Sequence, residues 1–419
     1  MRAALRTWSG RVGFGALLAL AALGTYRAVD FEGRDFAVFH AAFTQVLGGR
    51  GSTIYGTGPD RFLYAPGFAY LFAPVGYFPE KIALVIFSVL KLAALIHLLM
   101  MVQGRVLYFL PLGILAWGAL AAGRPLLIDF QYGQVNFLIS WAVLMAILIH
   151  FGDHRSRKLA FLSWMVASVA AAAKLLALPV LLIPWLRRGR AGSSWERAGT
   201  LFGVGMMFFL PIVVEGWQSG TALLLDWRQA LLSRGFPLET HNQSLPAFIY
   251  RVFGNSLSPF IAMEHKFDFS WGWLTEAGAA GWSLAIVLAV VWVELAFLVW
   301  PFFFRKDVLH RPAVSLAWAA LLVASLIFPS HLVWKSYFVF GIALYVMVWA
   351  WALTPGADRV TRIRRISLCA FLFVVANFSG FQFVGYAAAA RLESYCVQLW
   401  AHLGWLFLGA HVLRERLRA

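Results

Sequence analysis

Residues 82–103 read I-A-L-V-I-F-S-V-L-K-L-A-A-L-I-H-L-L-M-M-V-Q, a run in which Lys91 is the one Lys, Arg, Asp or Glu. A helix rises about 1.5 Å per residue, so a run of this length crosses the roughly 30 Å hydrocarbon core of a bilayer. Similar runs recur along the chain, and they predict helices at 12–29, 82–103, 106–123, 136–152, 198–217, 278–304, 312–329, 334–354, 366–380 and 396–413. The sequence therefore predicts an all-α polytopic membrane protein.

The composition agrees with this fold class. Hydrophobic residues make up 61% of the 419 residues and charged residues 13%, which excludes an ordinary soluble globular protein. Most of the net charge of +16 comes from short loops rich in Lys and Arg, whereas the longer loops are nearly neutral. The positive-inside rule places the short loops and both termini in the cytoplasm, and the basic balance needs no nucleic-acid partner.

The segment 159–186 is an exception, because basic residues flank both of its ends. A single crossing would leave one basic cluster outside, so we expect two shorter helices that turn near Lys174, with Pro179 beyond the turn. This hairpin brings the total to about twelve helices in one domain over residues 1–419. The long loops, which then face outward, are 30–81, 124–135, 218–277 and 381–395, and we expect loops 30–81 and 218–277 to form the active face.

Two outward loops and the hairpin carry the residues of chemical interest. Asp35 lies where a membrane helix emerges, and a carboxylate there can act as a base, whereas for Asp30 and Glu32 we favour ordinary solvated charges. Lys174 is an ammonium within an apolar hairpin, so it needs a partner such as Asp129 or a ligand anion, unless it is only a structural ion pair.

Other polar side chains suit a phosphate or the hydroxyl groups of a ligand. His331 and Lys335 are four residues apart, so on one helix they would project on the same side and meet a phosphate together, unless His331 only forms a local hydrogen bond. Arg251 has bidentate geometry for phosphate, although it also suits a lipid headgroup. Gln134 and Asn136 begin a helix, and their amides either bind the hydroxyl groups of a ligand or cap that helix. Lys91 and Glu294, which are also intramembrane, are expected to be structural.

The order of these residues along the chain resembles glycosyltransferase family 87. The matching positions are Asp35-Phe36-x-Val38-Phe39-x-x-Ala42, Leu47-Gly48-Gly49, Ile54-Tyr55, Phe62-x-Tyr64-x-Pro66, Gly133-Gln134-Val135-Asn136, Lys174 with Pro179, and Asn242-Gln243-Ser244-Leu245 with Arg251. They fall in the first three fifths of the chain. The chain departs from the family in having Ala65 where a second Pro is common and Phe39 where Tyr is common, and the lost hydroxyl leaves the acceptor open.

The resemblance implies a GT-C bundle in the bacterial inner membrane, with its active face on the periplasmic side. It implies that mannose passes from polyprenyl-phosphate-mannose to an outer-leaflet glycolipid or glycan, with inversion, with Asp35 as base, and without a metal or cofactor. We expect Arg251, Lys335, His331 and Lys174 to bind the donor phosphate. We expect Tyr64, Gln134, Asn136, Asn242 and Gln243 to bind the substrates.

Two alternatives stay open. A polytopic transporter or lipid flippase also fits buried charges, although transporters often repeat a broken helix in two halves, and only one broken segment is visible here. A GT-C enzyme with another sugar or a protein acceptor is the second alternative. For the basic N-terminus we favour an uncleaved anchor over a signal peptide. Cys369 and Cys396 are expected on opposite sides of the membrane, where they cannot form a disulfide.

Overall fold

A computed structural model describes residues 8–30, 33–56, 62–106, 110–152, 156–186, 193–233, 241–254, 273–304, 308–354 and 358–418. These residues form helices, with one isolated β-bridge between Gly254 and Leu274. Every helix range predicted from an apolar run contains a helix. Among the described residues, five helices are long and apolar enough to cross a membrane, or up to seven if each of two bent pairs is one span. The all-helical membrane fold is therefore confirmed, whereas the total of about twelve and the sidedness of the termini stay predictions.

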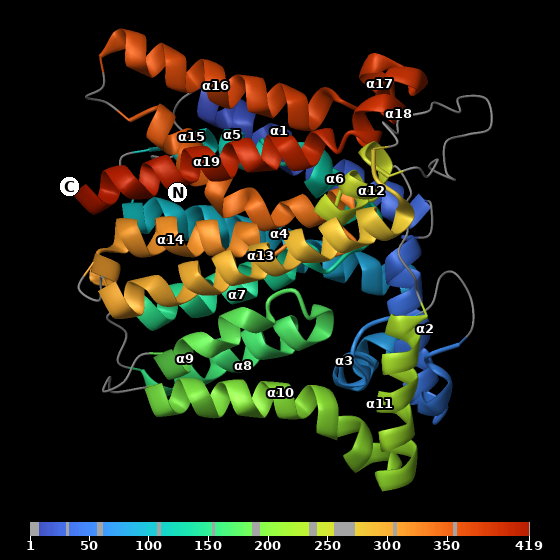
Figure 1. Cartoon of the computed structure of the whole chain (residues 1–419). Helices are drawn as coiled ribbons and strands as arrows, with labels where there is room; N and C mark the ends of the chain where they lie inside the picture. Colours follow the sequence, from blue (N-terminus) through green and yellow to red (C-terminus); the bar gives the residue numbers. More distant parts are fainter. Residues whose placement is uncertain are drawn as a thin grey trace. The chain divides into compact units, whose positions relative to one another are not determined.

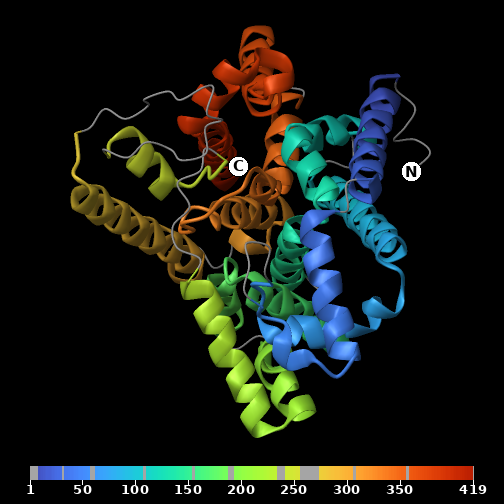
Figure 2. The same cartoon turned by 90° about the vertical axis from the view of Figure 1, so that its right-hand side faces the viewer.

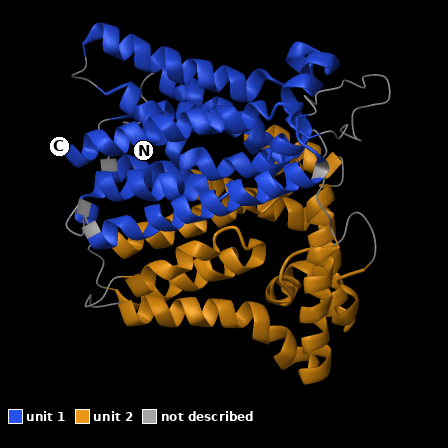
Figure 3. Ribbon diagram, viewed as in Figure 1, with its two compact units in different colours: residues 1–20, 96–128, 236–419 blue, residues 21–95, 129–235 orange. Residues whose placement is uncertain are grey.

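The chain divides into two compact units (Figure 3). Unit 1 contains residues 1–20, 96–128 and 236–419, and unit 2 contains residues 21–95 and 129–235. Three helices include a boundary between the units: α1 (Trp8–Asp30), α4 (Glu80–Val106) and α6 (Gly123–Gln131). The expectation of a single domain over 1–419 stays a prediction.

Unit 2 contains α2, α3 and α7–α11. Their bounds, with those of the 3-10 helices (η), are α2 Arg34–Leu47, η1 Gly51–Thr53, α3 Pro66–Phe72, η2 Ala73–Tyr77, α7 Asn136–Phe151, α8 Arg157–Lys174, η3 Leu178–Leu182, α9 Ile183–Leu186, α10 Ser193–Glu215 and α11 Trp217–Leu232. Helices α8, α9 and α10 lie side by side (Figure 1). The buried face of α8 carries Ala160, Ala167 and Ala171, and such small residues let helix backbones approach closely in a membrane.

Helix α8 ends at Lys174, as the sequence predicted. Leu175 adopts a left-handed conformation with φ 59°, and its backbone N–H donates to the Ala171 carbonyl. In the described residues up to Leu186, the short η3 and the four-residue α9 follow, because Pro179 and Pro184 lack backbone N–H groups. The hairpin therefore has one long arm and one short, irregular arm.

Helices α2 and α11 run across the direction of α8 and α10 (Figure 1). Helix α2 lies beside α3 and η2 (Figure 2), and its buried face consists of Phe36, Phe39, Ala42 and Phe43. Helix α11 confirms the helix predicted in loop 218–277. Its position at the membrane surface stays a prediction.

Unit 1 contains α5 and α12–α19. Their bounds are α5 Leu112–Leu120, α12 Leu245–Val252, α13 Glu276–Phe304, η5 Val308–His310, α14 Pro312–Ser325, η6 Lys335–Gly341, α15 Ile342–Ala352, α16 Arg359–Phe378, α17 Phe381–Val384, α18 Tyr386–Ser394 and α19 Val397–Arg418. Helices α14 and α15 are buried around most of their circumference and pack against α19, so they form the core of unit 1. In contrast, α13 exposes Trp282, Leu288 and Trp292, which suits contact with lipid.

The expected outer loops contain more helix than the sequence indicated. Residues 124–135 were expected to be a loop, but α6 continues through Gln131 after a bend of 79° from α5. Residues 381–395 contain α17 and α18, and α18 meets α19 at a bend of 55°. These helices are short and partly polar, so they gave no apolar run of spanning length.

Candidate active site

The first turn of α2 in unit 2 carries Asp35. The side chain is half-buried, and the following residue, Phe36, is anchored in the core. The first turn of a helix has backbone N–H groups without partners inside the helix, and its dipole favours a negative charge there. Asp30, by contrast, is exposed at the end of α1. Glu32 lies outside the described residues.

The turn between α6 and α7 packs against the start of α2. Gly133 in this turn has φ +62°, and the Gln134 N–H donates to the Asp129 carbonyl over 2.9 Å. The Phe36 N–H donates to the Tyr132 carbonyl over 3.2 Å, so the turn and the helix start share a backbone hydrogen bond. In this arrangement the Gln134 Nε2 donates to the Asp35 Oδ2.

A chain of side-chain hydrogen bonds continues from Gln134 to Lys174. The Asn136 Nδ2 donates to the Gln134 Oε1 over 3.3 Å, and the Lys174 Nζ donates to the Asn136 Oδ1. An ammonium only donates and a carboxylate only accepts, so the two ends fix the orientation of both amides. All three hydrogen bonds point toward Asp35, and bonds aligned in this way polarise one another. Gln134 and Asn136 are buried, whereas Asp35 and Lys174 are partly exposed.

Tyr64 completes the group of predicted residues in unit 2. Its ring centroid is 5.8 Å from the Lys174 Nζ, and the ring packs edge-on against Phe39 with centroids 4.8 Å apart. The Tyr55 hydroxyl donates to the Tyr64 carbonyl over 2.7 Å, and burial raises the pKa of Tyr55 far above its ordinary value. The Trp227 Nε1 of α11 donates to the neighbouring Leu63 carbonyl over 3.1 Å. Helix α11 thus helps to hold the segment that carries Tyr64.

Asp129, the partner expected for Lys174, also lies beside a second lysine. The Asp129 Oδ1 lies 3.1 Å from the Nζ of Lys91, and both side chains are fully buried. Lys174 interacts electrostatically with Asp129 and donates a hydrogen bond to the amide of Asn136. Nothing in the sequence could predict that one aspartate would interact with two lysines.

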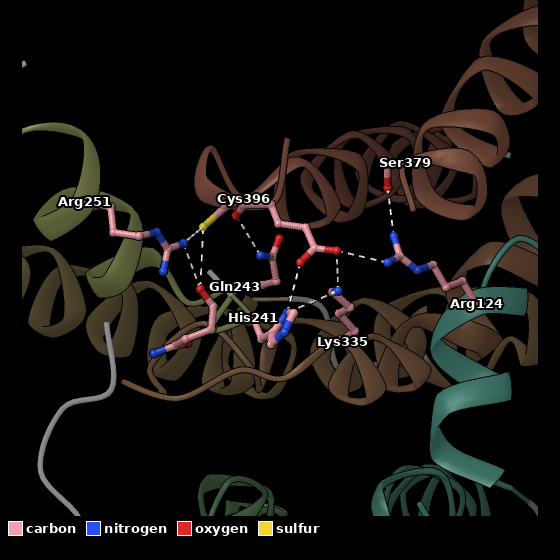
Figure 4. Close-up of polar contacts among 9 residues, drawn as sticks. Arg124, His241, Gln243, Arg251, Lys335, Ser379 and Cys396 are labelled. Carbon is pink, nitrogen blue, oxygen red and sulfur yellow. Dashed lines mark hydrogen bonds and ion pairs between the residues drawn. The ribbon is translucent and has the colours of Figure 1, made fainter. Parts of the chain in front are cut away.

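A second cluster, which contains the predicted Lys335, lies in unit 1 around Glu393 of α18. Arg124, His241 and Lys335 point toward its carboxylate (Figure 4). The Oε1 of Glu393 accepts from the Arg124 Nη2 over 3.0 Å and from the Lys335 Nζ, and its Oε2 lies 2.9 Å from the His241 Nδ1. The Glu393 side chain is 7% exposed and that of His241 is 57% exposed. One buried carboxylate is therefore surrounded by three basic groups, one of which faces solvent.

Asn242 and Gln243 bind backbone groups near this cluster. The Asn242 Nδ2 donates to the His331 carbonyl over 2.9 Å, and its Oδ1 accepts from the Val333 N–H over 3.0 Å. The Gln243 Nε2 donates to the Glu393 carbonyl over 2.8 Å. Both side chains are fully buried, so these contacts join three segments of unit 1.

Arg251 of α12 is also almost fully buried. Its Nη2 donates to the Asn242 carbonyl over 2.8 Å, its Nε donates to the Ser394 carbonyl over 3.2 Å, and its Nη2 contacts the Cys396 sulfur at 2.8 Å. Burial lowers the pKa of Arg251, and Cys396 and Glu393 act in the opposite direction. Cys369 and Cys396 are free thiols.

The expected helical pairing of His331 with Lys335 was wrong. Helix α14 ends at Ser325, His331 lies in an irregular segment, and Lys335 begins η6. A spacing of four residues places side chains on one face only within a continuous helix. The carbonyl of His331 accepts hydrogen bonds from Asn242 and from the Ser244 hydroxyl, and its side chain is exposed.

Sequence reasoning missed Arg124, His241 and Glu393. Each is a charged or titratable residue in a stretch expected to be an outer loop, which was the one available signal. Within the part of the chain that the structure describes, no group of three or more His, Cys, Asp or Glu residues is arranged to hold a metal ion.

Comparisons with known proteins complete this picture. The family model described as Glycosyltransferase family 87 matches residues 62–329, which is more than half of the chain. Neither a curated protein nor a solved structure matches the chain.

Proposed function

Because this chain belongs to glycosyltransferase family 87, we propose that it transfers mannose from polyprenyl-phosphate-mannose to a glycolipid or glycan in the outer leaflet. Family membership makes the protein a glycosyltransferase, which disfavours the transporter alternative. The donor, the acceptor and the periplasmic location of the active face in the inner membrane are our proposal.

The observation that carries the proposal is the hydrogen-bonded chain from Lys174 through Asn136 and Gln134 to Asp35. It holds a carboxylate at a helix start, with an ammonium at the other end and the Tyr64 ring beside that ammonium. A sugar transferase needs a base for the acceptor hydroxyl, a cation for the departing phosphate and an aromatic surface for the sugar. Asp35, Lys174 and Tyr64 are suited to these roles, and Gln134 and Asn136 to orienting Asp35 and the substrate.

In the proposed reaction, Asp35 accepts the proton of the acceptor hydroxyl as its oxygen attacks the anomeric carbon of the donor. The bond from that carbon to the phosphate oxygen breaks, and the phosphate leaves with the electron pair. Lys174 stabilises the negative charge that develops on the phosphate. A single displacement inverts the anomeric centre, so a β-linked donor gives an α-linked product.

We assign the predicted residues of unit 1 by their contacts. Lys335 and His331 remain proposed ligands of the donor phosphate, and His331 is exposed while Lys335 is partly exposed. Arg251, Asn242 and Gln243 are buried and bind backbone carbonyls, which supports a role in shaping the segments around Lys335 rather than direct contact with substrate.

The test is Asp35→Asn, which keeps the shape of the side chain and removes the base. We expect turnover to fall about 10²–10⁴-fold while the protein folds and still binds donor. The matched control is Asp30→Asn, an exposed carboxylate at the end of α1, for which we expect a much smaller loss. The assay uses radiolabelled polyprenyl-phosphate-mannose and a membrane glycolipid extract in detergent. Wild-type turnover of Asp35→Asn would contradict the proposal.

A further inference from the structure

Lys91 in α4 is a buried cation to which the proposed reaction assigns no role. Its side chain is fully buried in unit 2, and its Nζ is 4.6 Å from the ring centroid of Phe130 and 5.0 Å from that of Phe87. An ammonium in such a place is costly unless hydrogen bonds satisfy it.

The hydrogen bonds of Lys91 are made mainly to the backbone of one turn. Its Nζ donates to the Asp129 carbonyl over 2.7 Å, to the Asp129 Oδ1 over 3.1 Å and to the Gln134 carbonyl over 3.2 Å. The Asp129 carbonyl lies in the last turn of α6 and the Gln134 carbonyl lies shortly before α7, and the Gln134 N–H also donates to the Asp129 carbonyl, which closes the turn 129–134. Lys91 therefore ties both ends of the turn to one atom.

Neutralising a charge does not require this arrangement. A buried ion pair is often no more stabilising than two apolar side chains of similar volume. The ion pair with Asp129 alone therefore does not explain why a lysine stands at position 91. The backbone contacts differ, because they fix the residue whose amide donates to Asp35. A shift of the Gln134 backbone would move that amide away from the carboxylate.

We propose that Lys91 is a positioning residue, which holds the turn 129–134 so that Gln134 keeps Asp35 in its reactive orientation. This inference rests on the proposed function of Asp35 as base. Asp129 neutralises Lys91 and supplies one of the two carbonyls.

The experiment compares two paired variants that remove both charges. Lys91→Met with Asp129→Asn leaves no donor at position 91. Lys91→Gln with Asp129→Asn places an amide N–H₂ there on a side chain one bond shorter, which reaches one carbonyl at a time. We expect turnover of the methionine pair to fall about ten- to a hundredfold, with the donor KM little changed, and the glutamine pair to be intermediate.

A matched control removes another buried pair of unit 2. His150 and Glu196 are 2.8 Å apart, and His150 lies at the far end of α7 from Asn136. His150→Gln with Glu196→Gln should lower stability but leave turnover per folded molecule unchanged. Thermal unfolding in detergent measures the folded fraction of every variant.

A double-mutant cycle separates positioning from general damage. If Lys91 acts through Asp35, the methionine pair adds little further loss in an Asp35→Asn background. Wild-type turnover of either folded pair, or a loss that persists in full beside Asp35→Asn, overturns the inference. If the methionine pair does not fold, the turnover of the glutamine pair, alone and combined with Asp35→Asn, tests the inference instead. Wild-type turnover of Asp35→Asn itself refutes the proposed function, whereas an impaired Asp35→Asn with fully active paired variants refutes the role of Lys91 alone.

Discussion

Gly133→Ala tests whether the contact between the turn and α2 sets the activity. Gly133 has φ +62°, and a Cβ atom there would lie 2.5 Å from the Phe36 Cβ and 3.1 Å from the Leu84 Cδ1. The left-handed conformation costs an alanine about 1–2 kcal/mol. Forcing extra volume into a packed contact adds about 1–3 kcal/mol. We therefore expect the free energy of unfolding to fall by about 2–5 kcal/mol.

Gly49→Ala is the matched control within unit 2. Gly49 has φ +69°, but among the described residues no atom other than those of its chain neighbours would lie within 4 Å of its Cβ. An alanine there therefore has only the conformational cost. We expect Gly49→Ala to lose only about 1–2 kcal/mol. The difference between the two variants then measures the clash with Phe36.

The clash also predicts a loss of turnover. Restoring an ordinary contact of 3.4 Å from 2.5 Å requires the turn and α2 to separate by almost 1 Å. A displacement of about 1 Å at a reacting group can cost about 10²-fold in rate, and Gln134 and Asp35 lie on opposite sides of this contact. Denaturant titration in mixed micelles and turnover of the radiolabelled donor measure the two effects. Equal stability and equal turnover of the two variants would refute the packing argument.

The remaining predictions concern unit 1 and the topology. Arg251→Ala removes the guanidinium donor from the buried carbonyls of Asn242 and Ser394 and leaves Asn242 the weak thiol donor of Cys396. A lost buried hydrogen bond costs about 1–3 kcal/mol, so the yield of folded protein should fall sharply. Lys335→Ala leaves Glu393 with Arg124 and His241, so it should fold and raise the donor KM. An unchanged donor-saturation curve would show that Lys335 serves only in the ion pair with Glu393 and does not bind the donor. A reporter fused after Gly192 should lie in the cytoplasm, and one inserted near Gly220 should lie outside. A cytoplasmic signal from the second site would contradict the proposed location of the active face outside the cytoplasm.

The sequence predicted the helices where a clear physical signal determines them. The apolar run 278–304 lies within α13. The break at Lys174 followed from the basic residues that flank both ends of 159–186, together with a buried charge and the prolines beyond it. Helices α6, α17 and α18 were missed because they are too short for an apolar run. The pairing of His331 with Lys335 failed because the sequence does not reveal that the helix before them ends at Ser325.

The candidate site was predictable in part. The structure brings Asp35, Tyr64, Gln134, Asn136 and Lys174 together in unit 2, and the family resemblance had selected all five. Their order in the hydrogen-bonded chain was not predictable, since it depends on tertiary geometry. The same holds for Glu393, whose partner Arg124 is 269 residues away along the chain.

The interleaved order of the two units affects how the protein is made. Every residue of unit 2 precedes residue 236, whereas unit 1 needs residues 236–419 to join residues 1–20 and 96–128. Chains grow at about 5–20 residues per second, so the rest of the chain takes roughly 10–40 s. In the complete protein the Asn377 Nδ2 donates to the Leu120 carbonyl over 3.3 Å and to the Ala121 carbonyl over 3.1 Å. During that interval these two carbonyls lack this donor, because Asn377 has not yet been translated. The growing polypeptide thus contains all of the Asp35 site before Glu393, on which three basic groups converge, has been translated.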